Sequence, residues 1–240
     1  MLLAALIGAL RKQRRQSARV TALTNLAGQL GGTVHTGPEA ARPRAATLTA
    51  RQPEVVAGRV WGMTRYESAL DFQRGRWPVR VAEGSRRESR PSWNATDSPG
   101  MVDIRSHVVE IPTPSCPRLH FLPVRQNGLS LQISRQLDRP PIASPVPADV
   151  WASAPIPEAY RGVVQVSTSN AEFATAVLND QLLQWIAAHA QWFTDPVQLE
   201  YGLLYTESNG AADPASLLPR VDFLVGLLER IPHHAWQYRH

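Results

Sequence analysis

Residues 163–189 read VVQVSTSNAEFATAVLNDQLLQWIAAH, and this stretch decides the fold class because a strand pattern leads directly into a helix pattern. Val163–Val166 is rich in valine, which is typical of a buried strand. Ser169 and Glu172 have the spacing of a capping box, in which each side chain satisfies a backbone donor at the start of a helix. Large apolar residues then recur at helical spacing as far as about His189. They are Phe173, Val177, Leu178, Leu182, Trp185 and Ile186.

Downstream of this helix, the sequence predicts two short strands and a final helix. Apolar and polar residues alternate through residues 198–207, which is typical of strands. Asp213 followed by Pro214 predicts a helix start, because aspartate is a good N-cap and proline suits the first helical position. The helix should end before Pro232. Its expected apolar face is Leu217, Leu218, Val221, Leu224, Val225 and Leu228.

Upstream, the region from about residue 45 to 135 has a strand-like pattern. Short runs rich in valine and aromatic residues are separated by glycine, proline or polar residues, which favours an antiparallel meander. The runs are 55–62, 66–74, 79–83, 107–111, 119–124 and 129–134. The Asn127-Gly128 pair predicts a tight turn between the last two. Residues 85–100 are polar, and we expect an exposed loop there, with a long hairpin as the alternative.

The N-terminal part predicts one more helix and completes the fold class. Val20, Leu23, Ala27 and Leu30 form one apolar stripe in residues 17–30, and Gly31-Gly32 should end this helix. The predicted fold is α+β: an antiparallel sheet of six to nine strands with two C-terminal helices packed on it and an N-terminal amphipathic helix. A helix-and-sheet clamp around an apolar ligand is the alternative architecture.

The chain divides into three parts by composition. Residues 1–30 hold a short apolar anchor, a basic collar and a helix. Residues 31–232 form a single α+β domain, with a proline-rich strap at 138–157, and residues 233–240 form a tail. Ten of the 20 prolines fall between Pro112 and Pro157. Since proline fixes φ and removes a backbone donor, we expect no regular structure in the strap.

The net charge of +5 is confined to the N-terminus. Five basic residues precede Glu39, the first acidic residue, so residues 20–240 sum to zero (5 − 5 = 0). The five are Arg11, Lys12, Arg14, Arg15 and Arg19. A protein that binds nucleic acid generally presents a basic face on its folded body. We therefore expect no nucleic-acid partner.

The apolar residues that precede the basic cluster predict contact with a membrane. Residues 1–10, MLLAALIGAL, are fewer than the roughly 20 that a spanning helix needs. An apolar stretch followed by basic residues has the order of a signal anchor, which places the rest of the chain on the cytoplasmic face. The segment is the end of a longer anchor, a short interfacial helix, or an ordinary helix packed on the domain. The candidate membrane-contacting residues are Leu2, Leu3, Leu6, Ile7, Leu10, Arg11, Lys12, Arg14 and Arg15.

The order of these parts resembles an uncharacterised bacterial family whose members have an N-terminal membrane anchor, a basic collar, an amphipathic helix and one α+β domain. The similar stretches are 65–66, 72–75, 81–84, 108–112, 117–122, 166–178, Trp185 and 217–232. These motifs are structural patterns without an acid, base or ligand cluster. The resemblance therefore implies a fold and a location at the membrane, and it implies no activity.

The motifs that carry common enzyme chemistry are absent from the sequence. There is no phosphate-binding glycine loop, H-E-x-x-H, G-x-S-x-G or C-x-x-C, and Lys12 is the only lysine. Cys116 has one local base, His120, and we interpret it as a plain structural cysteine. His233 and His234 are interpreted as a solvated pair. We expect no catalytic residue, no metal site and no cofactor.

One group of residues has the composition of an anion or lipid head-group site. Arginines alternate with tryptophan in a strand-like region, although residues 61–120 sum to only +2 because acidic residues offset them. The group is Arg74, Arg76, Arg80, Arg86, Arg87 and Trp77. The predicted function is a membrane-associated, non-enzymatic cytoplasmic domain that binds an unknown protein partner. The alternatives are a lipid or small-ligand binding domain and an enzyme with an unrecognised site.

Overall fold

The computed structural model describes residues 17–41, 65–90, 100–124, 152–200 and 202–238. Several predictions lie outside them. They concern the membrane-contacting residues before Ser17, the strands at 55–62 and 129–134, the turn at 126–128, and the strap before residue 152.

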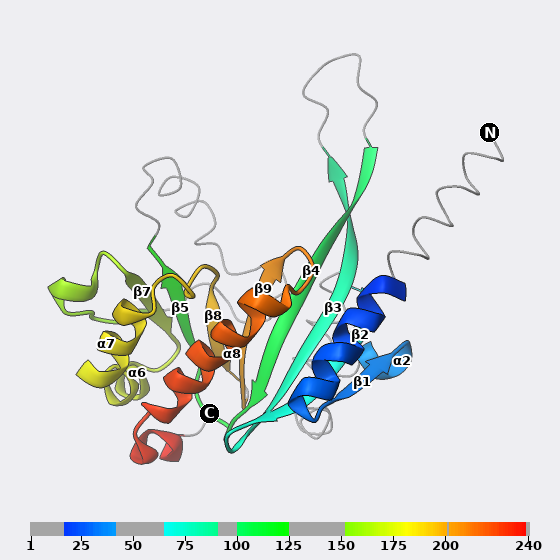
Figure 1. Cartoon of the computed structure of the whole chain (residues 1–240). Helices are drawn as coiled ribbons and strands as arrows, with labels where there is room; N and C mark the ends of the chain where they lie inside the picture. Colours follow the sequence, from blue (N-terminus) through cyan, green and yellow to red (C-terminus); the bar gives the residue numbers. More distant parts are fainter. Residues whose placement is uncertain (1–16, 42–64, 91–99, 125–151, 201, 239–240) are drawn as a thin grey trace.

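The centre of the fold is one nine-stranded antiparallel sheet (Figure 1), with the strand order β1-β2-β3-β4-β9-β8-β5-β7-β6. The strands are β1 (Thr33–Thr36), β2 (Arg65–Arg74), β3 (Trp77–Arg90), β4 (Gly100–Pro112), β5 (Leu119–Pro123), β6 (Ala152–Ser153), β7 (Val164–Thr168), β8 (Val197–Glu200) and β9 (Leu203–Asn209). The predicted α+β fold class is confirmed. The predicted meander holds from β2 to β4, β1 is an edge strand that the sequence did not predict, and the C-terminal strands β9 and β8 insert between β4 and β5.

The loop predicted at residues 85–100 is wrong at its two ends, because residues 85–90 belong to β3 and residue 100 belongs to β4. The alternative, a long hairpin, is correct for these residues. Strand pairing between β3 and β4 continues from Ser85 and Arg105 to Arg90 and Gly100. The polar residues of this stretch lie in a two-stranded ribbon that extends beyond the rest of the sheet (Figure 1). Because the ribbon has left the sheet, its residues need not alternate between apolar and polar to form strands.

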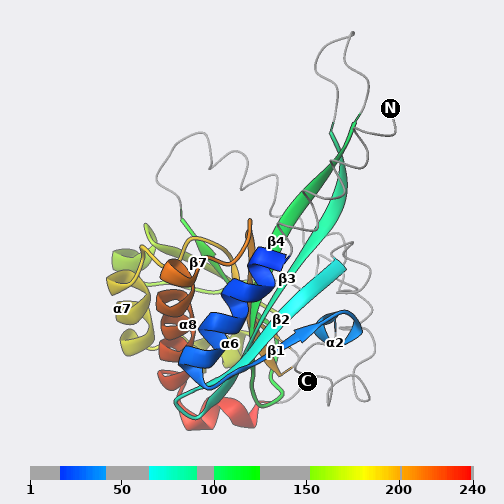
Figure 2. The ribbon, with the colours of Figure 1, turned by 45° about the vertical axis from the view of Figure 1, so that its right-hand side comes forward.

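The long helices cover one face of the sheet. They are the helix at residues 17–30, α6 (Ala171–Val177), α7 (Asp180–Ala188) and α8 (Pro214–Glu229). Figure 2 shows the 17–30 helix and α8 on the same side of the strands. An apolar core lies between these helices and the sheet. Its fully buried side chains include Leu70, Ile111, Phe121, Phe173, Leu182 and Phe223. Three short elements complete the fold: α2 (Pro38–Ala41), η2 (Glu158–Tyr160) and η3 (His233–Gln237).

The single helix predicted from 170 to 189 is two helices, because an asparagine interrupts it. Asn179 has an extended backbone, and its side-chain oxygen accepts the Leu182 N–H at 2.9 Å to start α7. Its side-chain nitrogen donates to the Arg230 carbonyl oxygen at 2.9 Å, which ties the break to the end of α8. An asparagine that can bond its own backbone competes with the helix interior.

The predicted capping box is also wrong, by one residue. Asn170 caps α6 by accepting the Phe173 N–H at 2.9 Å, whereas the Ser169 hydroxyl accepts the Arg118 N–H at 3.1 Å. The start of α8 is confirmed, since Asp213 accepts the Ala215 N–H and Pro214 opens the helix. Gly31 follows the 17–30 helix with φ 63°, a conformation that favours glycine.

Candidate functional site

A row of polar residues crosses the whole sheet on the face away from the long helices. The register places these residues opposite one another from edge to edge: Thr33, Asp71, Arg80, Glu110, Tyr205, Gln198, His120, Ser167 and Ser153. Side chains alternate between the two faces of a strand, so the adjacent row faces the helices. That second row is mainly apolar and includes Leu70, Val81, Val109, Val197, Phe121 and Val166. We call the first set the polar row.

At one end of the polar row, Asp71 and Arg80 form a buried ion pair. The Arg80 guanidinium donates to both carboxylate oxygens, with Nε at 2.7 Å and Nη2 at 2.9 Å. The Nε2 atom of His35 on β1 lies 3.2 Å from the same carboxylate, and the backbone oxygen of Glu39 lies 3.4 Å from Arg80 Nη1. Arg80 is only 6% exposed. Its charge is therefore compensated by direct partners, as a buried charge requires.

Near the middle of the sheet, Glu200 on β8 is surrounded by donors beside the polar row. His120 Nε2 lies 3.4 Å and Arg118 Nε 3.9 Å from its Oε2 atom. The Tyr205 hydroxyl contacts both Glu200 Oε1 and Gln198 Oε1. Burial by itself raises the pKa of Glu200, but His120, Tyr205 and Arg118 outweigh it and hold that pKa below its ordinary value. Glu200 is therefore a carboxylate at neutral pH.

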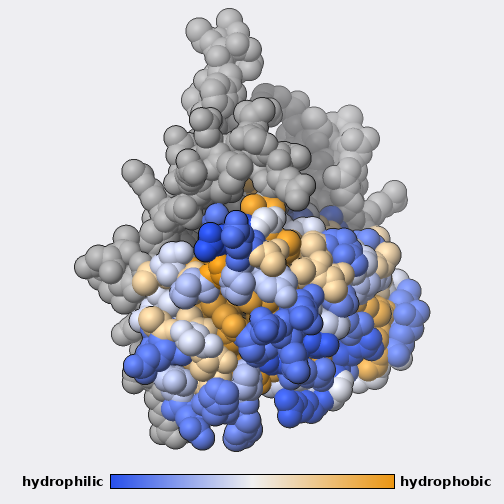
Figure 3. Space-filling view, turned by 90° about the vertical axis from the view of Figure 1, so that its left-hand side faces the viewer, coloured by the Kyte–Doolittle hydropathy of each residue, from blue (hydrophilic) through white to orange (hydrophobic). Residues whose placement is uncertain are grey.

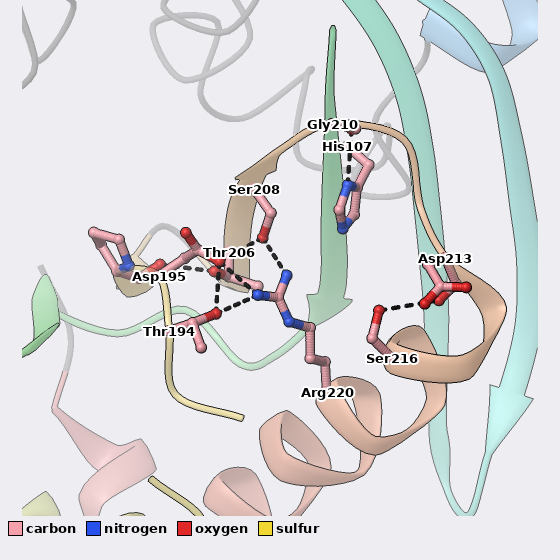
Figure 4. A network of polar contacts seen from close by, with 10 residues as sticks. His107, Thr194, Asp195, Thr206, Ser208, Gly210, Asp213, Ser216 and Arg220 are labelled. Atoms are coloured by element: carbon pink, nitrogen blue, oxygen red, sulfur yellow. Dashed lines mark hydrogen bonds and ion pairs between the residues drawn. The ribbon is translucent and has the colours of Figure 1, made fainter. Parts of the chain in front are cut away.

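A second polar network lies on the helix side and joins α8 to the sheet (Figure 4). Arg220 on α8 donates to Asp195 Oδ2 at 2.8 Å and to Ser208 Oγ on β9 at 2.5 Å, and it also contacts Thr194 Oγ1. The Ser208 hydroxyl donates to the same Asp195 oxygen at 2.8 Å. These bonds fix α8 against the segment before β8. Since every group in this set bonds another, the network positions the helix.

Glu83 on β3 occupies a buried position close to this network. Its carboxylate accepts the Ala212 N–H at 2.7 Å. Burial raises the pKa of Glu83, while the Ala212 bond and the charges of Arg19 and His107 oppose the rise. His107 is its cross-strand neighbour on β4, and the His107 Nδ1 atom lies 3.1 Å from the Gly210 carbonyl oxygen (Figure 4). Burial thus makes the Glu83 carboxylate easier to protonate than an ordinary glutamate.

Cys116 has the environment of a structural residue. Its side chain is fully buried, and burial raises the pKa of the thiol to about 12. The thiolate, which is the reactive form, is therefore scarce at neutral pH. His120, its expected local base, instead faces Glu200.

The structure divides the predicted anion site among three places. Arg74 forms a bidentate pair with Asp222 on α8, at 2.6 and 2.7 Å, and the exposed Arg76 lies over the Trp77 ring at 4.9 Å. Both arginines flank the turn at Gly75. Arg80 belongs to the polar row on the other face. Arg86 and Arg87 lie in the far half of β3. The six residues form no single cluster, and a lipid or anion contact stays a prediction for Arg86 and Arg87.

Three further observations concern the class of site. In the parts of the chain that the structure describes, no helix is both long and apolar enough to cross a membrane. Within the same residues, no three histidine, cysteine or acidic side chains are grouped so that they could hold a metal ion. On the side that carries α6 and α7, hydrophilic residues predominate and hydrophobic ones show between them (Figure 3).

The polar row offers hydrogen bonding and charge recognition more than proton transfer. The Asp71 carboxylate in the row and the Glu200 carboxylate beside it are each paired with cationic side chains, which favour the ionised form. Sequence reasoning missed this row because it depends on which strands are neighbours. Its local signal was the alternation of polar with apolar residues in segments such as 79–83, 119–123 and 197–200.

Comparisons with known proteins add a fold relationship. No protein-family model and no curated protein matches this chain. The structure is similar to the crystal structure of the mycobacterial trehalose monomycolate transport factor A, TtfA. The TM-score is 0.53 and the sequence identity 10%, over 91% of this chain and 97% of that chain. At this identity the likeness shows a shared fold alone, and it agrees with the expected resemblance to an uncharacterised bacterial family.

Proposed function

We propose that this chain is a non-catalytic factor that works at the cytoplasmic face of a membrane in the transport of a lipid. The observation that carries the proposal is the fold shared with TtfA, because it extends over nearly the whole of both chains. TtfA is named as a transport factor for a glycolipid, trehalose monomycolate. A shared fold supports this function by analogy, since one fold hosts many functions.

The N-terminal sequence supports the location. An apolar segment followed by Arg11, Lys12, Arg14 and Arg15 suits an anionic membrane surface, where each basic residue contributes about 1 kcal/mol. The absence of net charge in residues 20–240 leaves the N-terminus as the chain's main electrostatic attachment to such a surface.

A role without catalysis is supported by the state of the reactive groups. The Cys116 thiol is buried and protonated, and the Asp71 and Glu200 carboxylates are held by cationic partners. We therefore propose that the domain acts by binding a protein partner of the transport process, with no chemical step of its own.

A test in the source cell follows the lipids. After depletion of this chain, newly made lipids are labelled with radioactive acetate, and the surface-extractable and cell-retained fractions are compared. One lipid class should accumulate in the cell and fall at the surface, and the full chain should restore it. A variant with Arg11, Lys12, Arg14 and Arg15 replaced by glutamine should restore it poorly. An unchanged distribution of every lipid class would contradict the proposal.

The polar row favours a second candidate function, the direct binding of a lipid or small polar ligand. Arg80, Glu110 and Glu200 are 6%, 2% and 9% exposed, so this face concentrates charged groups away from water. Native mass spectrometry of the full chain from its own membrane would show a bound lipid if this candidate is correct. A measured mass equal to that of the chain without a ligand would count against this second candidate function.

A further inference from the structure

The far halves of β3 and β4 form a two-stranded arm that leaves the sheet. We define the arm as residues 86–90 and 100–104, which pair with each other from Arg86 and Ile104 to Arg90 and Gly100. The pairing of β2 with β3 ends at Ser85, and that of β4 with β9 ends at Ser106. Five residues of strand extend about 17 Å. The arm therefore projects beyond the strands on both of its sides, as Figures 1 and 2 show.

The N-terminal helix begins at the same end of the molecule as the arm. Arg19, in the first turn, is close enough to Glu83 for its charge to act on that carboxylate. After the helix, a Cβ atom at Gly32 would lie 2.6 Å from the Asp71 backbone oxygen, near the opposite end of β2 and β3. The helix thus runs antiparallel to β3 and begins on the arm side of the molecule (Figure 2).

Chain length limits how far the apolar segment can lie from the arm. Seven Cα-to-Cα steps separate Leu10 from Ser17, and they span at most about 25 Å when fully extended. The arm rises about 17 Å on the same side. Leu10 is therefore tethered within about 25 Å of the start of the 17–30 helix, which lies on the arm side of the molecule (Figure 2).

The composition of the arm suits the head-group region of a bilayer. Three of the five residues in its β3 strand are arginines, Arg86, Arg87 and Arg90, and its β4 strand contains Met101, Val102 and Ile104. Glu88 and Asp103 reduce the net charge of the arm to +1 (3 − 2), and Asp103 lies opposite Arg87 in the register. Arginine binds phosphate oxygens through several donors, and the apolar residues suit the boundary below them.

We propose that the arm is a second contact with the anionic phospholipid surface at the N-terminus, and that the two contacts together orient the sheet on the membrane. This inference rests on the membrane location proposed above. It also gives Arg86 and Arg87 a different role from Arg74, Arg76 and Arg80, which lie at the other end of β3 or in the polar row. An isolated ribbon of two strands is marginally stable in water, and contact with a surface would stabilise it.

A fluorescent reporter on the full chain tests the arm directly. Cys116 is buried with a thiol pKa of about 12, so a single new cysteine can be labelled selectively with a nitrobenzoxadiazole dye. Ser89→Cys places the dye on the arm, and Gln73→Cys places it on an exposed residue at the opposite end of the sheet. With vesicles that contain phosphatidylglycerol, emission should shift to the blue and brighten for the Ser89→Cys protein alone.

The outcomes separate the arm from membrane association as a whole. If both labelled proteins pellet with the vesicles while the dye at position 89 is unchanged, or if both dyes shift equally, the arm proposal is wrong and the membrane location survives. If neither protein pellets, both proposals are overturned.

Charge reversal gives a second, independent measurement. Arg86→Glu with Arg87→Glu should weaken vesicle binding at least about tenfold, because two cations near an anionic surface become two anions. The matched control is Arg76→Glu with Arg161→Glu, two exposed arginines outside the arm. Equal binding by the two variants would overturn the proposal. Circular dichroism spectra that match the parent protein exclude misfolding as the cause.

Discussion

Arg80 on β3 donates two hydrogen bonds, of 2.7 and 2.9 Å, to the Asp71 carboxylate on β2, on the face of the sheet that the long helices leave open. Removing two charges from water costs free energy that the pair recovers only through such geometry. Replacing only one residue of the pair should therefore cost much folding stability, whereas replacing both with apolar residues should cost much less.

We predict that Arg80→Met lowers the free energy of unfolding by about 3–5 kcal/mol, because it leaves the Asp71 charge without its guanidinium. Asp71→Leu combined with Arg80→Met should cost less than that single change. Urea unfolding followed by circular dichroism measures both. The matched control, Arg76→Met at an exposed site, should cost no more than about 1 kcal/mol. Additive losses for the two single substitutions would show that the residues act independently.

We predict opposite effects for two Gly→Ala changes within helices. A Cβ at Gly226 in α8 would overlap the Trp185 indole. That ring is held by a 3.1 Å bond from Nε1 to the Phe223 carbonyl oxygen and by Arg230, whose guanidinium carbon lies 3.7 Å from its centroid. Gly226→Ala should cost about 1–3 kcal/mol through overpacking, despite the higher helix propensity of alanine.

The control is Gly28→Ala in the 17–30 helix, where a Cβ meets nothing within 4 Å. It should leave stability unchanged or raise it by up to about 1 kcal/mol. Thermal unfolding of both variants measures the difference. Equal melting temperatures would mean that Trp185 moves aside without cost.

Two of the buried acids, Glu83 and Glu200, should give opposite dependences of stability on pH. The pKa of Glu200 is lowered below 4.5, so its contribution is present above the unfolded-state pKa and is lost as the pH falls through the folded value. The pKa of Glu83 is raised above 4.5, so its contribution is present at acid pH and is lost as the pH rises through the folded value.

Urea midpoints across the acid to neutral range therefore distinguish two variants. Glu200→Gln should be less stable than the parent protein at neutral pH, and the gap should narrow on acidification. Glu83→Gln should match or exceed the parent protein at neutral pH, because it removes a buried charge, and its advantage should vanish in acid. Variants that change stability in the same direction at neutral pH would contradict the assigned environments.

Local signals in the sequence sufficed for much of the fold. Asp213-Pro214 located the start of α8, Gly31 located the end of the 17–30 helix, and short apolar runs located β5 and β7. These features act within a few residues, so they can be interpreted from the sequence alone. The break at Asn179 was missed although this residue caps α7 locally, since the bond that ties the break in place goes to the distant Arg230 carbonyl oxygen.

The candidate site was less predictable, since it depends on neighbours that are far apart in the sequence. Glu110 meets Tyr205 only because β9 pairs with β4, and no local pattern gives that register. Charge alone could not distinguish Arg80, which is buried against Asp71, from Arg86 and Arg87 in the arm. The grouping of all these arginines into one anion site ignored the length of β3, which separates them.

Flotation of the full chain with vesicles tests most directly whether this protein works at an anionic membrane. We predict that the chain floats with vesicles containing phosphatidylglycerol and that added salt weakens this association. Replacement of Arg11, Lys12, Arg14 and Arg15 by glutamine should leave most of the protein at the bottom of the gradient. A parent chain that stays at the bottom with these vesicles would contradict the proposed location, and with it the role in lipid transport.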